Sequence, residues 1–155
     1  MNTNISNIMM TVFGTMVFSI AQGQETGVEE VKKTIMQFAT AADYQDPIIL
    51  EEVLDANFRV VMNRLFGSEG VAIMPREVYL AKITFGSGGL RAKIKNKEFG
   101  GDKREVTISN VTINGNTANA LVSFKGSKMT FVSTLLLVLT KEGKWKLVAD
   151  LPNVI

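Results

Sequence analysis

The chain has 155 residues, 46% of them apolar, and its 17 basic and 15 acidic side chains give a formal net charge of +2. The length favours one domain, and the charge is too near balance to indicate a nucleic-acid partner. The chain has neither histidine nor cysteine, which excludes a Ser-His-Asp triad, a cysteine nucleophile and a His/Cys zinc site. No arrangement of the remaining side chains specifies a reaction, so we assign no catalytic residue, metal or cofactor.

The first 23 residues have the pattern of a secretory signal peptide. No charge precedes Glu25, and an apolar run extends from Ile8 to Ala21. A run of this length is short for a membrane span but suits the central region of a signal peptide. We therefore expect a signal peptide at residues 1–23, followed by a single domain at residues 24–155.

Small residues favour cleavage of this segment before Gln22 or Gln24. The segment before the apolar run, Met1 to Asn7, lacks the usual Lys or Arg. This leaves a buried N-terminal helix or an uncleaved membrane anchor as alternatives. The expected location is periplasmic or secreted, with no stable membrane insertion after cleavage.

Two helices are predicted next. Apolar residues recur at helical spacing over residues 28–42, after a capping box that begins at Thr26. Asp46 and Pro47 then provide an N-cap and a first-turn proline for a short helix that ends at about Leu54.

A strand is predicted over residues 57–63, with Phe58, Val60 and Met62 on one face and Arg59 on the other. A second short strand follows at residues 71–74. Pro75 then opens a third helix, which carries Tyr79.

From Arg104 onward the apolar residues alternate with a period of two, which predicts a meander of strands. The apolar face changes parity around Ser109 and Asn110, so we predict a β-bulge that bends the strand and curves the sheet. The next strand covers residues 117–125, and the last covers residues 145–150.

The strand from Met129 to Thr140 is apolar on both faces. A strand buried on both sides in so small a chain needs cover over its second face. We expect a second copy of the chain to provide it, and thus a homodimer.

The order of these elements resembles the nuclear transport factor 2-like superfamily. Three stretches carry the resemblance: Phe38 to Asp46 with the apolar residues that follow it, Thr134 to Leu139, and the hairpin Gly143 to Leu147. Within the superfamily the chain is most similar to the lumazine-binding-like small bacterial proteins, and more loosely to the polyketide-cyclase-like group. The resemblance implies an α+β fold, in which N-terminal helices pack on a strongly curved antiparallel sheet that forms a cone, or cystatin-like roll.

The sequence departs from the catalytic members it resembles. Members similar to steroid isomerases place an acid on the first strand, where this chain has Arg59 and Asn63 and no carboxylate between Asp55 and Glu69. Cyclase and dehydratase members commonly use histidine, which is absent. Both departures favour a protein without enzymatic activity.

Six residues are candidates for contact with a ligand in the cone. Four bulky side chains from different elements are expected to line it, namely Phe38, Tyr79, Phe124 and Phe131. Tyr44 is placed at its rim, either donating a hydrogen bond to the ligand or lying in solvent. Arg59 either points into the cone and holds an anionic group, or lies on the surface if Phe58 and its neighbours face the core. Burial preference favours the surface position for Arg59.

The leading hypothesis is an exported, non-catalytic protein that binds a small apolar or aromatic ligand. Its rival is an isomerase or cyclase type of enzyme with Asp150, Asp43 or Tyr44 as acid or base. A third possibility is a structural or interaction module whose cone is filled by its own side chains. A carboxylate or tyrosine inside the cone with a perturbed pKa would distinguish them.

Overall fold

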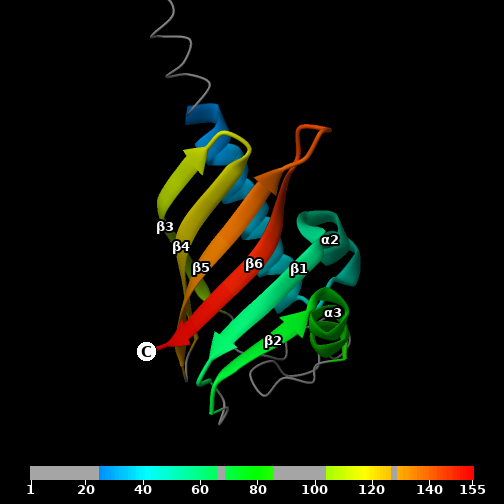
Figure 1. Ribbon diagram of the computed structural model, residues 1–155, viewed down its shortest axis with the longest axis vertical. Coiled ribbons are helices and arrows are strands. Elements are labelled where there is room, and N and C mark those ends of the chain that lie inside the picture. The colour runs from blue at the N-terminus through cyan, green and yellow to red at the C-terminus, as the bar shows by residue number, and fades with distance from the viewer. Residues whose placement is uncertain (1–24, 66–68, 86–103, 127–128) are drawn as a thin grey trace, which may run out of the picture.

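A curved six-stranded sheet wraps around one long N-terminal helix (Figure 1). The structure is a computed structural model and describes residues 25–65, 69–85, 104–126 and 129–155, so the expected signal peptide lies outside the described residues. The strand order is β2-β1-β6-β5-β4-β3. All neighbouring strands are antiparallel except β1 and β6, which are parallel. Helices packed on an open, curved sheet give the expected α+β fold, but the parallel pair β1–β6 makes the sheet mixed rather than wholly antiparallel as predicted.

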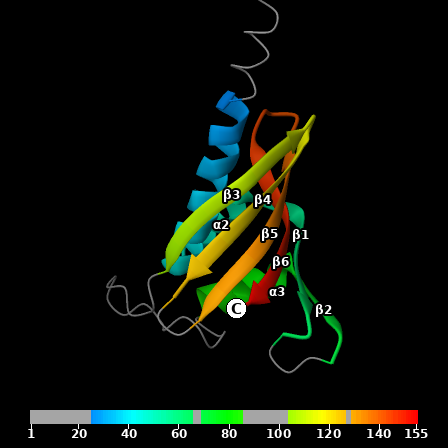
Figure 2. The same cartoon turned by 90° about the vertical axis from the view of Figure 1, so that its left-hand side faces the viewer.

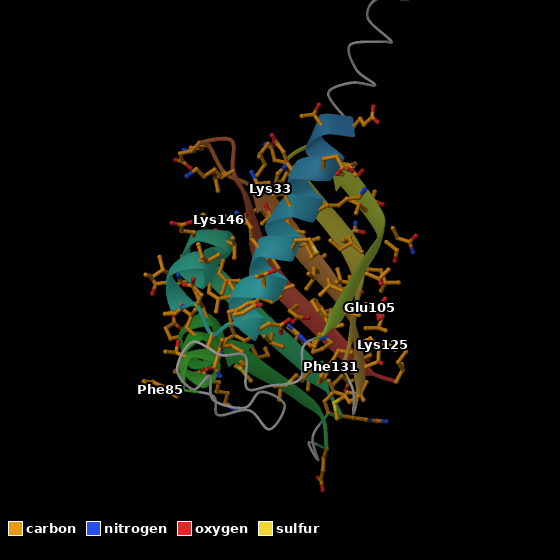
Figure 3. All side chains as sticks on the ribbon, turned by 180° about the vertical axis from the view of Figure 1, so that it is seen from behind. Lys33, Phe85, Glu105, Lys125, Phe131 and Lys146 are labelled. Atoms are coloured by element: carbon orange, nitrogen blue, oxygen red, sulfur yellow. The ribbon has the colours of Figure 1, made fainter. Side chains whose placement is uncertain are left out.

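The strands and the two shorter helices have these bounds: α2 Pro47–Val53, β1 Leu54–Asn63, β2 Val71–Pro75, α3 Arg76–Thr84, β3 Glu105–Asn114, β4 Thr117–Lys125, β5 Thr130–Leu139 and β6 Trp145–Val154. The N-terminal helix covers residues 25–43 of the described chain. It lies across one face of the sheet, called here the inner face (Figures 2 and 3). The opposite face is the outer face.

The N-terminal helix buries one stripe of apolar side chains against the sheet. Val31, Ile35 and Ala42 are wholly buried, at the spacing predicted from the sequence. The predicted N-cap at Thr26 is wrong, because Glu25 and Thr26 are already helical.

The Asp46 side chain caps α2 as predicted. One of its carboxylate oxygens accepts hydrogen bonds from the Ile48 and Ile49 amides at 3.0 and 3.2 Å. The helix ends at Val53, and β1 begins immediately at Leu54 rather than at Asn57.

Register shifts interrupt three strand pairs of the described sheet, namely β3–β4, β5–β6 and β1–β6. The first lies in the β3–β4 ladder between Ser109 and Thr112, and Asn110 there has a φ of 50°, which confirms the bulge predicted from parity. The second lies in β6 opposite the step from Leu136 to Leu137, and it was not predicted from the sequence. β6 also runs to Val154, well beyond the predicted end at Asp150.

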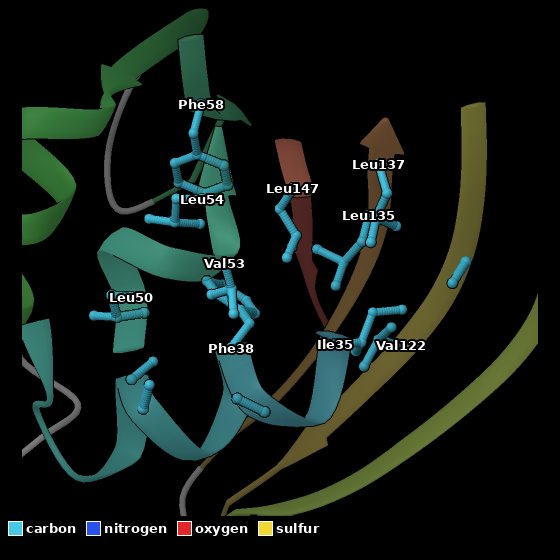
Figure 4. Close-up of a cluster of buried hydrophobic side chains, with 14 of the residues drawn as sticks. Ile35, Phe38, Leu50, Val53, Leu54, Phe58, Val122, Leu135, Leu137 and Leu147 are labelled. Atoms are coloured by element: carbon cyan, nitrogen blue, oxygen red, sulfur yellow. The ribbon is translucent and has the colours of Figure 1, made fainter. Parts of the chain in front are cut away.

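The hydrophobic core fills the space between the N-terminal helix and the inner face (Figure 4). Val122, Leu135, Leu137 and Leu147 come from neighbouring strands and are at most 1% exposed. Ile35 on the helix points at this row in Figure 4. The predicted alternation of β4 is confirmed, since Ala118, Ala120, Val122 and Phe124 are all buried.

Candidate functional site

Side chains on the inner face are wholly buried at one end of the sheet and more exposed at the other. Along β5, Leu137, Leu135 and Ser133 are at most 1% exposed, whereas Phe131 is half-buried. Val154 on the neighbouring β6 is 39% exposed, and Met62 on β1, the next strand along, is half-buried. The register places Val154, Phe131, Phe124 and Val106 in one row across β6, β5, β4 and β3. We call this end of the inner face the open end.

A buried ion pair lies at the open end. Arg104 Nε donates a hydrogen bond to an Asp43 carboxylate oxygen at 2.7 Å, and Arg104 Nη2 lies 2.7 Å from the same oxygen. The Arg104 and Asp43 side chains are only 13% and 9% exposed. Asp43 is the last residue of the N-terminal helix and Arg104 directly precedes β3, so the pair ties the helix end to the edge of the sheet.

The Arg104 guanidinium also lies on an aromatic ring. Its central carbon is 4.6 Å from the centre of the Phe124 ring, a cation–π contact. Phe124 is directly opposite Phe131 in the β4–β5 ladder. The open end thus combines a charged pair with two adjacent phenyl rings. The inward direction of Arg104 could have been predicted from the sequence, because Arg104 is an even-numbered residue like the inward-facing Val106 and Ile108.

Asp150 is a second buried carboxylate on the inner face. It is 9% exposed and is paired in register with Val60 on one side and Leu135 on the other. The bulge in β6 brings it there, since Leu147 and Asp150 both face inward although their numbers differ in parity. Buried carboxylates are rare unless they hold a partner or a function, so Asp150 is a further candidate site residue.

Three aromatic rings pack together beneath α3. The Phe38 and Tyr79 rings stack with centres 6.0 Å apart, and the Phe58 ring meets Tyr79 edge-on at 5.2 Å. All three residues are at most 9% exposed. The predicted site residues therefore fall into two groups, Phe38 with Tyr79 and Phe124 with Phe131, both on the inner side of the sheet.

Tyr44 and Arg59 do not join these groups. Tyr44 is 49% exposed in the turn after the N-terminal helix. Arg59 is exposed and faces away from the core, because its neighbours Phe58 and Val60 are buried. The surface position favoured for Arg59 is confirmed.

Among the hollows of the described residues, two border the N-terminal helix. The larger, about 540 Å³, is bounded by that helix, α2 and the β5–β6 hairpin, with Lys33 and Lys146 among its lining residues (Figure 3). The Thr140 hydroxyl, through a hydrogen bond, lowers the pKa of Glu142 in this hairpin. The smaller hollow, about 470 Å³, includes Tyr44. Phe38, Tyr79, Phe124 and Phe131 line neither hollow.

Within the described residues, no three carboxylates lie close enough to hold a metal ion. No helix in that part of the chain is long and apolar enough to cross a membrane.

Comparison with known proteins identifies the fold. The sequence model of the family described as "Putative lumazine-binding" matches residues 25–151. No curated protein matches the chain in sequence.

Solved structures share the architecture at low sequence identity. A nuclear transport factor 2-like protein of unknown function from Silicibacter pomeroyi is 17% identical, with a TM-score of 0.67 over 84% of this chain and 98% of that one. Another from Shewanella baltica is 12% identical, with a TM-score of 0.65 over 84% and 94%. A protein named "putative ketosteroid isomerase" from Shewanella frigidimarina is 17% identical, with a TM-score of 0.58 over 82% and 98%. These likenesses confirm the nuclear transport factor 2-like fold expected from the sequence.

Proposed function

Since the chain belongs to the family described as "Putative lumazine-binding", we propose that it binds a small, largely apolar or aromatic ligand at the open end of the inner face. We further propose that it does so without catalysis, as an exported homodimer. The observation that carries the binding proposal is the buried pair of Asp43 and Arg104 beside Phe124.

A buried ion pair adds little net stability to the packing of a helix on a sheet. Removing two charges from water costs several kcal/mol per ion, and apolar residues of similar size often stabilise a fold as well or better. The pair lies on the buried Phe124, whose neighbour across the β4–β5 ladder is the half-buried Phe131. Charged groups in such a place are suited to orienting a bound molecule, with the phenyl rings supplying apolar contact.

The ligand would meet many carbon atoms and few polar groups. Phe124, Phe131 and Val106 form the row across the open end, and Met62 flanks it on β1. The guanidinium donors of Arg104 and the carboxylate of Asp43 supply polar contacts of both kinds. This combination suits a planar ring system with hydrogen-bonding groups on its edge.

The rival, an acid–base enzyme, is favoured by one observation, the burial of Asp150 between Val60 and Leu135. Two observations favour binding alone. The carboxylate of Asp43 is already engaged by Arg104. The inward-facing residues of β1 are Leu54, Phe58, Val60 and Met62, none of which can move a proton.

Binding is tested first by native mass spectrometry of the purified protein, which would reveal a co-purified small molecule. Lumazine is then titrated and followed by its fluorescence. Arg104→Met is expected to weaken binding at least tenfold, while Arg59→Met, the same change on the outer face, leaves it unaltered. Equal affinity of the two variants for lumazine would contradict the proposal. So would a wild-type chain that neither binds lumazine nor carries a small molecule detectable by mass spectrometry.

Export is supported by the uncharged apolar run before Glu25. The test is N-terminal sequencing of protein recovered outside the cytoplasm. Chains that begin at Gln22 or Gln24 are the expected result. Recovery only of cytoplasmic chains that begin at Met1 would argue against export.

The homodimer is supported by the outer face of β5, where Leu136 is 38% exposed and Val132 and Val138 are half-buried. Light scattering is expected to show an assembly that Leu136→Lys weakens, since the lysine would bury a charge at the contact. Met36→Lys is the control, because Met36 is 42% exposed on the N-terminal helix, which covers the opposite face. An unchanged assembly in the Leu136 variant would exclude this contact.

A further inference from the structure

β2 is an edge strand whose hydrogen-bonding groups can be assigned individually. It pairs only with β1 among the described strands, with Val60 opposite Met74 and Val61 opposite Ile73. In the same register the Arg64 amide donates to the Gly70 carbonyl at 3.0 Å. Because hydrogen-bonded pairs alternate along an antiparallel ladder, Ala72 and Met74 direct their amides and carbonyls toward β1. The backbone groups of Val71, Ile73 and Pro75 therefore point away from the sheet.

The same alternate residues carry exposed apolar side chains. Val71 is 66% exposed and Ile73 is 61% exposed, and the strand has no charged residue. Natural edge strands usually carry charges or bulges that discourage pairing with other chains. The opposite edge, β3, has both, since Glu105 is exposed and Asn110 lies in a bulge. β2 has neither a charge nor a register shift against β1, and its one protective residue, Pro75, lies at the end of the strand.

An exposed apolar stripe on α3 adjoins this edge. Val78 is 43% exposed and Phe85, one residue past the helix, is 70% exposed, while Ala81 lies between them at helical spacing and is also exposed. α3 follows β2 without a connecting loop. Figure 1 shows α3 on the β2 side of the molecule, and Figure 3 shows Phe85 pointing outward from its margin. Two consecutive elements therefore expose apolar residues, with Val71 and Ile73 on the outer face of β2 and Val78, Ala81 and Phe85 on or just after α3.

We propose that this edge pairs with the same edge of a second copy of the chain, antiparallel and around a two-fold axis at Ile73. The register that overlaps the whole strand sets Ile73 opposite the partner's Ile73, and Val71 opposite the partner's Pro75. The Ile73 amides then donate to each other's carbonyls, and each Val71 amide donates to a Pro75 carbonyl.

Self-complementarity favours a second copy over an unrelated peptide. In this register every outward amide of β2 finds an acceptor. The one residue without an amide hydrogen, Pro75, faces Val71 at the end of the ladder, where water can reach the unpaired carbonyl. In a two-fold interface the same surface of each chain contacts the other, so the hydrogen-bonding groups of both are paired in the same way. The two Ile73 side chains also meet on the outer face, which buries both.

This contact is separate from the one proposed for the outer face of β5. It uses the edge at β2, whereas Leu136 lies three strands away in the sheet order. The β5 contact would form the homodimer, and the β2 contact would join two such dimers; neither depends on a bound ligand. Variants at Ile73 and at Leu136 therefore report on different surfaces.

The absence of cysteine permits a position-specific cross-linking test. Ile73→Cys would place two thiols in a hydrogen-bonded pair with Cα atoms about 5.5 Å apart, within the roughly 4.4–6.8 Å range of disulfides. Mild oxidation is expected to convert most of this variant to a covalent dimer. Thr107→Cys, exposed on the opposite edge strand, is the matched control and is expected to stay largely monomeric on non-reducing gels. Equal cross-linking of both variants overturns the proposal.

A second measurement needs no cysteine. Sedimentation of Ile73→Lys is expected to show the average mass at a given concentration reduced by about half relative to Thr107→Lys, because a lysine pair at the axis repels itself. Circular dichroism checks that both variants keep the fold, which the 61% exposure of Ile73 favours. A wild-type chain that sediments as a monomer at submillimolar concentration, or an Ile73→Lys variant with unchanged mass, overturns the proposal.

Discussion

The ion pair of Asp43 and Arg104 makes a quantitative prediction about stability. Arg104→Met removes the guanidinium beside a carboxylate that is only 9% exposed. Losing one partner of a buried pair costs about 3–5 kcal/mol of unfolding free energy, and the residual 13% exposure of Arg104 favours the lower end. The lost cation–π contact with Phe124, 4.6 Å from the guanidinium, adds about 0.5–1 kcal/mol, partly offset by methionine packing on the ring. We expect a total near 3 kcal/mol, or a melting temperature lowered by roughly 6–12 °C.

Urea unfolding followed by the fluorescence of Trp145, the one tryptophan and only 7% exposed, measures this loss. The double variant Asp43→Leu with Arg104→Met removes both charges, and we expect it to lose less than Arg104→Met alone. Arg59→Met, on the exposed face of β1, should change the unfolding free energy by about 0.5 kcal/mol or less. If Arg104→Met costs under about 1 kcal/mol, the pair behaves like a solvent-exposed one and the reasoning about its burial is refuted.

Three further predictions concern the frame around the site. Leu135→Ala, at a wholly buried position, should cost about 2–5 kcal/mol of unfolding free energy, while Leu136→Ala on the outer face should cost about 1 kcal/mol or less in chemical denaturation of the monomer. Thr140→Val should raise the pKa of Glu142 toward its usual value, as measured by NMR titration. Because the pKa of Glu142 is lower in the folded state than in the unfolded state, its ionised carboxylate stabilises the fold above the unfolded-state pKa. That stabilisation is lost as the pH falls through the folded-state pKa. Gly143→Ala, at a φ of 75°, should lower stability by about 1–2 kcal/mol in thermal unfolding.

The order of elements could be predicted because each has a local signal. Asp46 and Pro47 mark the start of α2, and the structure shows the Asp46 carboxylate accepting two amide hydrogen bonds there. The apolar residues of β3 are even-numbered before Asn110 and odd-numbered after it. A bulge at Asn110 keeps both sets on one buried face, which is why the sequence predicts it. Signals of this kind depend only on neighbouring residues, so no tertiary contact is needed to interpret them.

The second bulge could not be predicted because the residues around it are apolar on both faces. Leu147, Val148 and Ala149 follow one another in β6, so no polar residue marks where the alternation changes. The parallel pairing of β1 with β6 has no local signal either, since the two strands are far apart in sequence. The register of β6 is set by its neighbours, and from the sequence alone Asp150 had no determined side.

The candidate site shows the same division between local and distant information. Arg104 shares the parity of the inward-facing Val106, so its side of the sheet was implied by the alternation alone. What the alternation cannot give is its partner, because Asp43 lies 61 residues away in the sequence and reaches Arg104 only when the N-terminal helix crosses the inner face. Tyr44, one residue beyond Asp43, was the sequence-based choice at this helix end, yet the turn directs it to solvent. A shift of one residue at the end of a helix rotates the side chain by about 100°, which is enough to exchange a buried charge for an exposed ring.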